Sequence, residues 1–163
     1  MAEIVLREIT RENFRECVSL KLEPSQEALV APNVESLAEA KVDPTLVPLA
    51  IYDRAALGAP LGDHGMVGFT MYGPVAAVGF IKRLMIDKRF QRKGYGRAAM
   101  REVIRRLRLD PQVQLIGTRH RRENEAAANL YRNLGFTPWK VPWQNPDPDE
   151  VYVALHDLGR AGL

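Results

Sequence analysis

Residues 81–99 read IKRLMIDKRFQRKGYGRAA, and the rest of the chain is organised around this stretch. Within this stretch, residues 84–86 are apolar and bulky, which is typical of a buried strand. A basic turn containing Gly94 and Gly96 follows, and the residues after it have a helical pattern. A strand, a glycine turn and a helix in this order favour anion binding, because the first N–H groups of a helix lack partners within it and the helix dipole attracts negative charge.

The glycine turn is strongly basic. Five cationic side chains surround it: Lys88, Arg89, Arg92, Lys93 and Arg97. Residues 94–99 also satisfy the dinucleotide-binding pattern G-x-G-x-x-G/A. That fold requires an acid about 20 residues later, at the end of the next strand, to bind a ribose. The expected next strand, residues 113–118, contains no acid, and Asp110 precedes it, so we reject the dinucleotide interpretation.

Two motifs resemble those of one enzyme family. Residues 91–96, QRKGYG, resemble the Q/R-x-x-G-x-G/A signature with which the GNAT family of N-acetyltransferases binds acyl-CoA. Residues 124–136 resemble the family pattern N-x-x-A-x-x-L-Y-x-x-x-G-F. The two motifs occur in the family's order, and the resemblance covers nearly the whole chain. Within the family, residues 33–40 and 68–72 are similar to the bacterial spermine/spermidine acetyltransferases.

The resemblance implies the α/β fold of the GNAT family, a mixed and mostly antiparallel sheet of about seven strands flanked by about four helices. The sequence pattern shows a compatible order without a linker, so we expect a single domain over residues 1–163. Strands are expected at residues 4–9, 49–52, 66–72, 79–86, 113–118, 136–141 and 150–155, and helices after Thr10, after a cap at Asn33, and over 96–109 and 124–134. We expect Gly73-Pro74 to turn the chain between the third and fourth strands.

The resemblance also implies where acetyl-CoA, the expected co-substrate, would bind. Its pyrophosphate is expected over the glycine turn. Its pantetheine arm is expected along residues 84–86, where family members splay two parallel strands, and a strand edge can pair the amides of the arm. The implied coenzyme contacts are Leu84, Met85, Ile86, Gln91, Arg92, Lys93, Gly94, Tyr95, Gly96, Arg97 and Asn124. Asn124 could instead simply cap the helix that follows it.

Tyr131 is the implied general acid of acetyl transfer. Attack of an amine on the thioester expels a thiolate, and a phenol with a pKa of about 10 can protonate it. The alternative is that Tyr131 is a core residue. The attacking amine, with a pKa of about 10.4, is mostly protonated at neutral pH, so freeing its lone pair costs about 4 kcal/mol. Some relatives carry an acid for this task on the fourth strand, where this chain has Lys82-Arg83. A different acid or a chain of waters could deprotonate the amine, and we therefore assign no base.

Acidic residues in the first quarter of the chain are expected to bind the acceptor. Glu23, Glu27, Glu35 and Glu39 occupy the segment that borders the acceptor side in relatives. Glu35 and Glu39 are spaced i, i+4, which places them on one helix face, and a multivalent cation would relieve their repulsion. We therefore expect a polyamine such as spermine or spermidine as the acceptor. The alternatives are that these acids are solvated, or that the acceptor is a protein amino group or another small amine.

No metal site is expected. His64, His120 and His156 are isolated and lack the paired ligand spacing of zinc sites. His120 lies in the basic run RHRR at residues 119–122, which predicts a surface loop near the coenzyme or a contact with RNA. An RNA-binding module is disfavoured, because only 7% of the residues are aromatic. A catalytically silent acyl-CoA sensor is a further alternative.

The composition is that of an ordinary globular protein. The 163 residues are 46% hydrophobic and 26% charged, with a net charge of +3, which is less basic than a dedicated nucleic-acid binder. The single cysteine, Cys17, excludes an intrachain disulfide and is expected in the core. Neither a signal peptide nor an apolar run of about 18 residues is recognisable, so we expect a cytoplasmic protein that contacts no membrane and no nucleic acid. A homodimer formed through the last two strands is expected by analogy with relatives.

Overall fold

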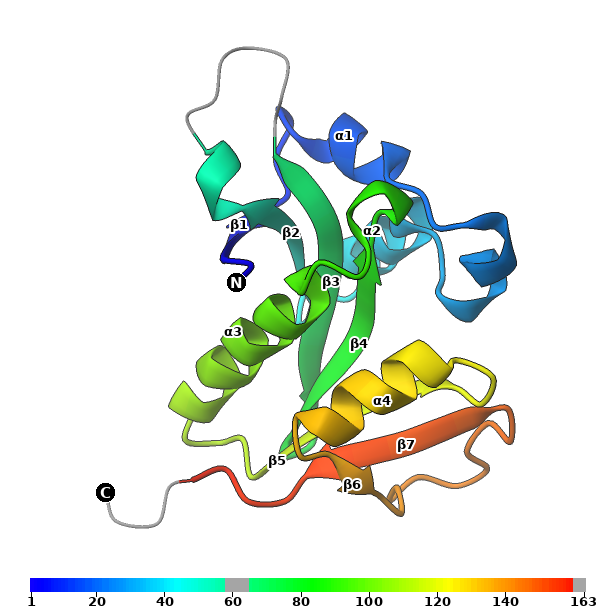
Figure 1. The fold of residues 1–163 in the computed structure, drawn as a ribbon. Helices are drawn as coiled ribbons and strands as arrows, with labels where there is room; N and C mark the ends of the chain where they lie inside the picture. The colour runs from blue at the N-terminus through cyan, green and yellow to red at the C-terminus, as the bar shows by residue number, and fades with distance from the viewer. Residues whose placement is uncertain (58–64, 160–163) are drawn as a thin grey trace.

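The computed structural model describes residues 1–57 and 65–159 (Figure 1). Over these residues, seven strands form one mixed sheet in the order β1-β2-β3-β4-β5-β7-β6. Neighbouring strands are antiparallel except β4 and β5, which are parallel. The strands are β1 (Ile4–Glu8), β2 (Val47–Asp53), β3 (Met66–Val75), β4 (Val78–Ile86), β5 (Leu115–Arg121), β6 (Thr137–Pro138) and β7 (Glu150–Leu155). The sheet confirms the fold class predicted from the sequence.

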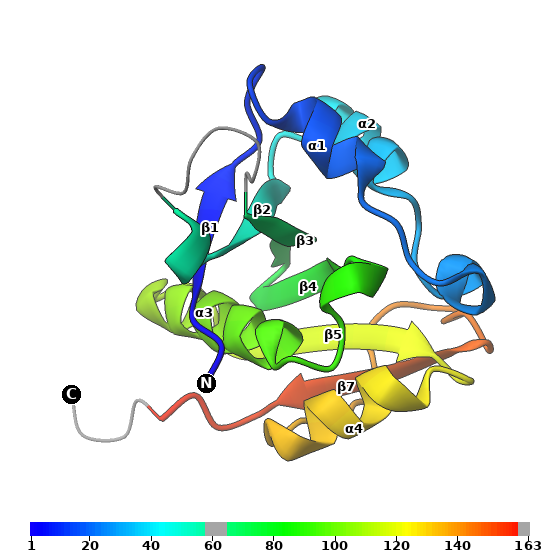
Figure 2. The same cartoon turned by 45° about the horizontal axis from the view of Figure 1, so that its top comes forward.

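Helices cover both faces of the sheet. The α-helices are α1 (Phe14–Ser19), α2 (Asn33–Val42), α3 (Tyr95–Leu109) and α4 (Glu125–Asn133), and the short 3-10 helices are η1 (Pro24–Leu29), η2 (Arg54–Ala56) and η3 (Lys88–Phe90). Figure 2 shows α1 and α2 on one side of the first four strands and α3 on the other, while α4 lies along β7. In the part of the chain that the structure describes, no helix is both long enough and apolar enough to cross a bilayer.

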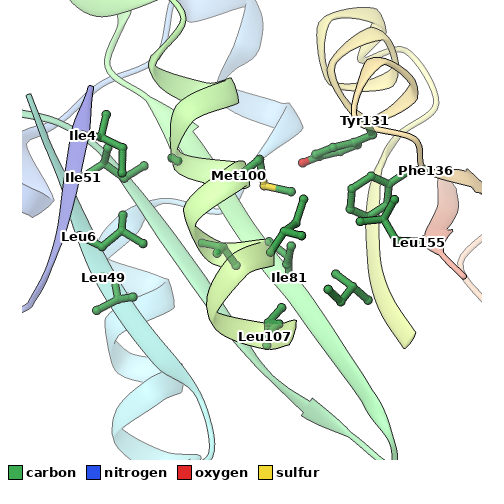
Figure 3. Close-up of a cluster of buried hydrophobic side chains, with 14 of the residues drawn as sticks. Ile4, Leu6, Leu49, Ile51, Ile81, Met100, Leu107, Tyr131, Phe136 and Leu155 are labelled. Carbon is green, nitrogen blue, oxygen red and sulfur yellow. The ribbon is translucent and has the colours of Figure 1, made fainter. Parts of the chain in front are cut away.

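Two buried clusters fill the two sides of the sheet. The first lies under α3 and α4 (Figure 3). From α3 it receives five residues at helical spacing, namely Ala99, Met100, Val103, Ile104 and Leu107. The second cluster, under α1 and α2, contains Cys17, Phe69 and Met71. Burial raises the pKa of the Cys17 thiol to about 12, so this cysteine is an unreactive core residue, as predicted.

The turn between β3 and β4 differs from the prediction. β3 continues through Gly73-Pro74 to Val75, and the chain turns at residues 76–77, where Ala76 has a φ of 53°. A proline is tolerated in this part of β3 because the ladder from β2 ends at Tyr72, so Pro74 need not donate a hydrogen bond to β2.

Two further local predictions were wrong. Asn33 is the first residue of α2 and not its cap, and its buried side chain instead donates to the Cys17 carbonyl at 2.9 Å. The basic residues 119–121 belong to β5 and not to a loop, because β7 pairs with β5 as far as Arg121. His120 is consequently buried, with 8% of its surface exposed.

Candidate active site

The parallel strands β4 and β5 pair over only part of their length. Their ladder runs from Val78 and Leu115 to Ile81 and Thr118, although both strands continue for several residues. At the last pair, the Thr118 hydroxyl donates to the Ile81 carbonyl at 2.8 Å. Beyond this pair, backbone groups of β4 and β5 are not paired with each other and can bind the amides of an extended ligand. The two strands therefore separate beside residues 84–86, as the resemblance described above implies.

A cleft of about 1030 Å³ extends from this separation to the glycine turn, a volume that suits a large organic ligand. All but one of the predicted coenzyme residues line it, namely Leu84, Met85, Ile86, Gln91, Arg92, Gly94, Tyr95, Gly96, Arg97 and Asn124. Lys93 instead lines a neighbouring hollow of about 750 Å³, which Gly94 and Arg97 also border.

The glycine turn places the start of α3 against the cleft. Gly94 precedes the helix with a φ of 88°, in the left-handed region that favours glycine. A Cβ on Gly96 would lie 3.7 Å from Ile86 and 3.8 Å from Leu130, which are ordinary contacts, so protein atoms alone do not require a glycine there. The N–H groups in the first turn of α3 have no partners within the helix, and Arg97 lies beside them. This end of the cleft is suited to a phosphate.

Two residues of the turn are anchored by their side chains. The Gln91 amide donates to the Ile86 carbonyl at 3.0 Å and exchanges hydrogen bonds with Gln26 of η1 at 2.8 and 3.1 Å. The Tyr95 hydroxyl donates to Asp53 at 2.9 Å. Burial, together with this carboxylate, raises the pKa of Tyr95. These side chains therefore hold the turn in place.

Asp87, directly after β4, supports the same turn and was missed in the sequence analysis. Its carboxylate accepts from the Lys21 N–H at 2.9 Å and from the Arg89 guanidinium at 2.8 Å. Burial acts to raise the pKa of Asp87, but these hydrogen bonds outweigh it and hold the pKa below its usual value. An acid immediately after a buried strand was the available signal.

Tyr131 extends from α4 toward the separated strands and is 5% exposed. Its ring centroid lies 6.0 Å from that of His120 and 5.5 Å from that of Phe136. Its hydroxyl is directed away from α4 toward the sheet and α3 (Figure 3). Burial raises the pKa of Tyr131 to about 12, against the opposing effect of a hydrogen bond with Thr118. The phenol is therefore protonated throughout the neutral pH range.

His120 is the second polar ring in this part of the cleft, and the sequence analysis placed it in a loop. Its Nδ1 lies 2.8 Å from the Arg121 carbonyl oxygen, and the residue lines the cleft. Within residues 1–57 and 65–159, no three His, Cys, Asp or Glu side chains are grouped so that they could hold a metal ion. His64 lies outside the described residues.

Asn124 caps α4. Its side-chain oxygen accepts from the Ala127 N–H at 3.1 Å, which is the structural alternative considered above. The residue also borders the cleft, so the cap fixes the end of α4 that faces the strand separation.

The four acids predicted to bind the acceptor do not form one group. Three of them line the cleft, namely Glu23, Glu27 and Glu35. Glu39 does not line it, and its carboxylate forms ion pairs with Lys82 and, at 3.3 Å, with Arg83. Glu35 and Glu39 are therefore not a free carboxylate pair, and cations of β4 already compensate Glu39.

The wall of the cleft beyond the separated strands carries charges of both signs. The Arg83 side chain is 11% exposed, and burial lowers the pKa of its guanidinium. Its Nε is buried without a hydrogen-bond partner among the described residues. Glu150, which the sequence analysis missed, lines the cleft from the start of β7 and lies 3.8 Å from the Arg121 Nε.

Comparison with known proteins identifies the family to which this chain is similar. The family model described as "Acetyltransferase (GNAT) family" matches residues 7–136. Among solved structures, a domain from Methanocaldococcus jannaschii DSM 2661 aligns with a TM-score of 0.72 at 16% identity, over 95% of this chain and 99% of that chain. A search of curated protein sequences found no match.

Two acetyltransferases with different acceptors in their names are about equally similar. The ribosomal-protein-S18-alanine N-acetyltransferase from Escherichia coli aligns with a TM-score of 0.66 at 18% identity, over 93% of this chain and 92% of that chain. The spermidine N-acetyltransferase from Vibrio cholerae, solved with CoA and spermine, aligns with a TM-score of 0.67 at 14% identity, over 93% of both chains. At such identities these structures establish the shared fold and not a shared acceptor.

Proposed function

The chain belongs to the acetyltransferase (GNAT) family, and on that premise we propose that it moves an acetyl group from acetyl-CoA to a primary amine. The observation that carries this proposal is the separation of β4 from β5 after Ile81 and Thr118, where the cleft begins. A thioester held there would have Tyr131 beside it and the glycine turn at the far end of its coenzyme. Family members use acetyl-CoA, and the residues of this cleft suit its phosphates and its amides.

The coenzyme would be held mainly by backbone groups. We assign its pantetheine arm to the edge of β4 at residues 84–86 and its pyrophosphate to the first turn of α3, with Arg92 and Arg97 nearby. Gln91 and Tyr95 would act through the backbone that their side chains anchor. Lys93, in the neighbouring hollow, would reach the phosphates only from outside the main cleft.

Tyr131 would serve as the general acid. Because burial keeps the phenol protonated, it can hydrogen-bond to the sulfur as the C–S bond breaks and then supply its proton. The hydrogen bond with Thr118 ties the hydroxyl to the residue at which the strands separate.

For the acceptor, we propose a polyamine such as spermine or spermidine. Glu23, Glu27 and Glu35 supply negative charge along the cleft, which a chain of ammonium groups would match. Glu39 would contribute indirectly, because it is engaged by Lys82 and Arg83. A spermidine acetyltransferase of the same fold is among the similar structures, although its identity of 14% leaves the acceptor to experiment.

Turnover over a panel of amines tests both the acetyltransferase activity and the polyamine acceptor. Release of free coenzyme A is measured with spermine, spermidine, lysine peptides and aminoglycosides at equal concentration. Highest kcat/KM with spermine or spermidine is expected. Turnover of lysine peptides alone would replace the polyamine with a protein amino group. Binding of acetyl-CoA without release of coenzyme A for any amine would instead favour a silent acyl-CoA sensor. A cytoplasmic location and a homodimer are also part of the proposal, and sedimentation tests the latter.

A further inference from the structure

The acetyltransferase reaction needs a proton acceptor that neither motif supplies. A primary amine is mostly protonated at neutral pH and cannot attack until it loses a proton. On β4, where some relatives have an acid, this chain has Lys82 and Arg83, and both are paired with Glu39. Both are cations, so the proton has to be taken by another side chain of the cleft or through a chain of waters.

His120 is suitably placed for this role. It lies on β5 two residues beyond Thr118, where the ladder with β4 has ended, and it lines the cleft although only 8% of its surface is exposed. Its ring is in contact with the ring of Tyr131, at 6.0 Å between centroids. The proposed acid and a titratable nitrogen are thus neighbours at the position assigned to the thioester.

The hydrogen bond of His120 determines which ring nitrogen carries the proton. Nδ1 lies 2.8 Å from the Arg121 carbonyl oxygen, which can only accept. Nδ1 therefore carries the proton in the neutral ring, and the lone pair is on Nε2. A histidine held in one tautomer by a backbone carbonyl has the arrangement of a positioned base.

The charged neighbours of His120 on β5 project to the opposite face of the strand. Side chains alternate along a strand, so Arg119 and Arg121 lie on the opposite face of β5 from His120, although both residues also line the cleft. The Arg119 guanidinium lies over the Phe80 ring at 6.0 Å, and Arg121 lies 3.8 Å from both Asp147 and Glu150.

The carboxylates that line the cleft come from other elements: Glu23 from the residue directly before η1, Glu27 from η1, Glu35 from α2 and Glu150 from the start of β7. Among the titratable side chains that line the cleft in the described part of the chain, His120 is the one in ring contact with Tyr131.

We propose, on the premise of the acetyltransferase activity above, that His120 is the general base. Its Nε2 takes one proton from the acceptor ammonium, and the freed lone pair forms the C–N bond to the thioester carbon. The tetrahedral intermediate then collapses, the C–S bond breaks with its electron pair on sulfur, and Tyr131 gives its proton to that sulfur. The extra proton on the new amide nitrogen returns to the Tyr131 oxygen. His120 releases its proton to solvent, so one ammonium and one thioester yield an amide, a thiol and one proton.

The test is H120N, compared on two acceptors of different basicity. Asparagine can keep the donor to the Arg121 carbonyl, but it has no atom equivalent to Nε2. With a strongly basic amine, kcat/KM should fall about 100-fold while the KM for acetyl-CoA is unchanged. With trifluoroethylamine, which is largely unprotonated at neutral pH, the fall should be less than about threefold, because no base is needed. H156N, the same change at an exposed histidine outside the cleft, should leave both rates unchanged.

Each outcome is decisive. An equal loss with both amines means that His120 has only a structural role, and an unchanged rate with the basic amine excludes it as the base. If H120N does not fold, the same two-amine comparison with H120Q decides, because glutamine fills the ring's place but is not a base. If the wild-type protein acetylates no amine, the acetyltransferase proposal itself fails, which is distinct from failure of the His120 assignment.

Discussion

Replacing Tyr131 with phenylalanine removes one oxygen from the centre of the cleft and leaves the ring. The ring contacts with His120 and Phe136 are retained, and the hydrogen bond with Thr118 is lost. One buried hydrogen bond contributes about 1 kcal/mol to the free energy of unfolding, so Y131F should fold. A large loss of turnover in a folded variant can therefore be assigned to the hydroxyl.

The expected loss of turnover is about 100-fold, equivalent to about 2.7 kcal/mol in the activation barrier. Because burial raises the pKa of Tyr131 to about 12, the wild-type phenol is protonated at neutral and mildly alkaline pH. The ratio of wild-type to Y131F rates should therefore be constant between about pH 6 and pH 9. A ratio that declined with rising pH in this range would mean that the phenol titrates there.

The assay is the initial rate of coenzyme A release, followed with a thiol reagent at saturating acetyl-CoA and amine. Calorimetry should give the same acetyl-CoA affinity for both proteins. Y152F is the matched control, because Tyr152 contacts Trp143 and does not line the cleft, and its rate should equal that of the wild type. A folded Y131F with near wild-type turnover would refute the reasoning and make Tyr131 structural.

Three further predictions concern the glycine turn, the acids and a surface ion pair. G96E should fold, because a Cβ at Gly96 meets only ordinary contacts. Its carboxylate should repel the pyrophosphate and weaken acetyl-CoA binding at least tenfold in calorimetry, about 1.4 kcal/mol. Unchanged affinity for acetyl-CoA would show that the glycine turn does not bind the pyrophosphate. E35Q should raise the KM for spermine several-fold without changing the KM for acetyl-CoA. E39Q should lower the free energy of unfolding by about 2 kcal/mol in urea titrations, because it leaves Lys82 and Arg83 unpaired. A raised spermine KM in E39Q together with an unchanged one in E35Q would contradict these roles. Hydrogen bonds, first of all from Arg105, lower the pKa of Glu102 to about 2 from 4.5. The pKa of Glu102 is lower in the folded state, so its stabilising effect is present above pH 4.5 and is lost as the pH falls toward 2. E102Q should lower the free energy of unfolding by about 1 kcal/mol at pH 7 and by progressively less in acid. A difference in unfolding free energy that did not change with pH would contradict this prediction.

Much of the fold could be predicted because its signals are local. The apolar spacing that continues from Met100 to Leu107 marks α3, and the left-handed φ of Gly94 requires only the turn itself. The turn predicted at Gly73-Pro74 was wrong, because a proline interrupts a strand only where a neighbouring strand needs an N–H at that position, and β2 no longer pairs with that part of β3. The extent of β5 likewise depended on β7, which lies some 30 residues further along the chain.

The candidate site divides in the same way. The sequence by itself determined the glycine turn and the family, and it predicted an anion site at that turn and a catalytic role for Tyr131, because these depend on short motifs whose geometry is built by neighbouring residues. Only the tertiary structure decided that Glu39 is neutralised by Lys82 and Arg83 and that His120 is buried against Tyr131. Those contacts join a helix and strands that are distant in the chain, and the charge and protonation of a side chain depend on what packs against it in space and not on its neighbours in sequence.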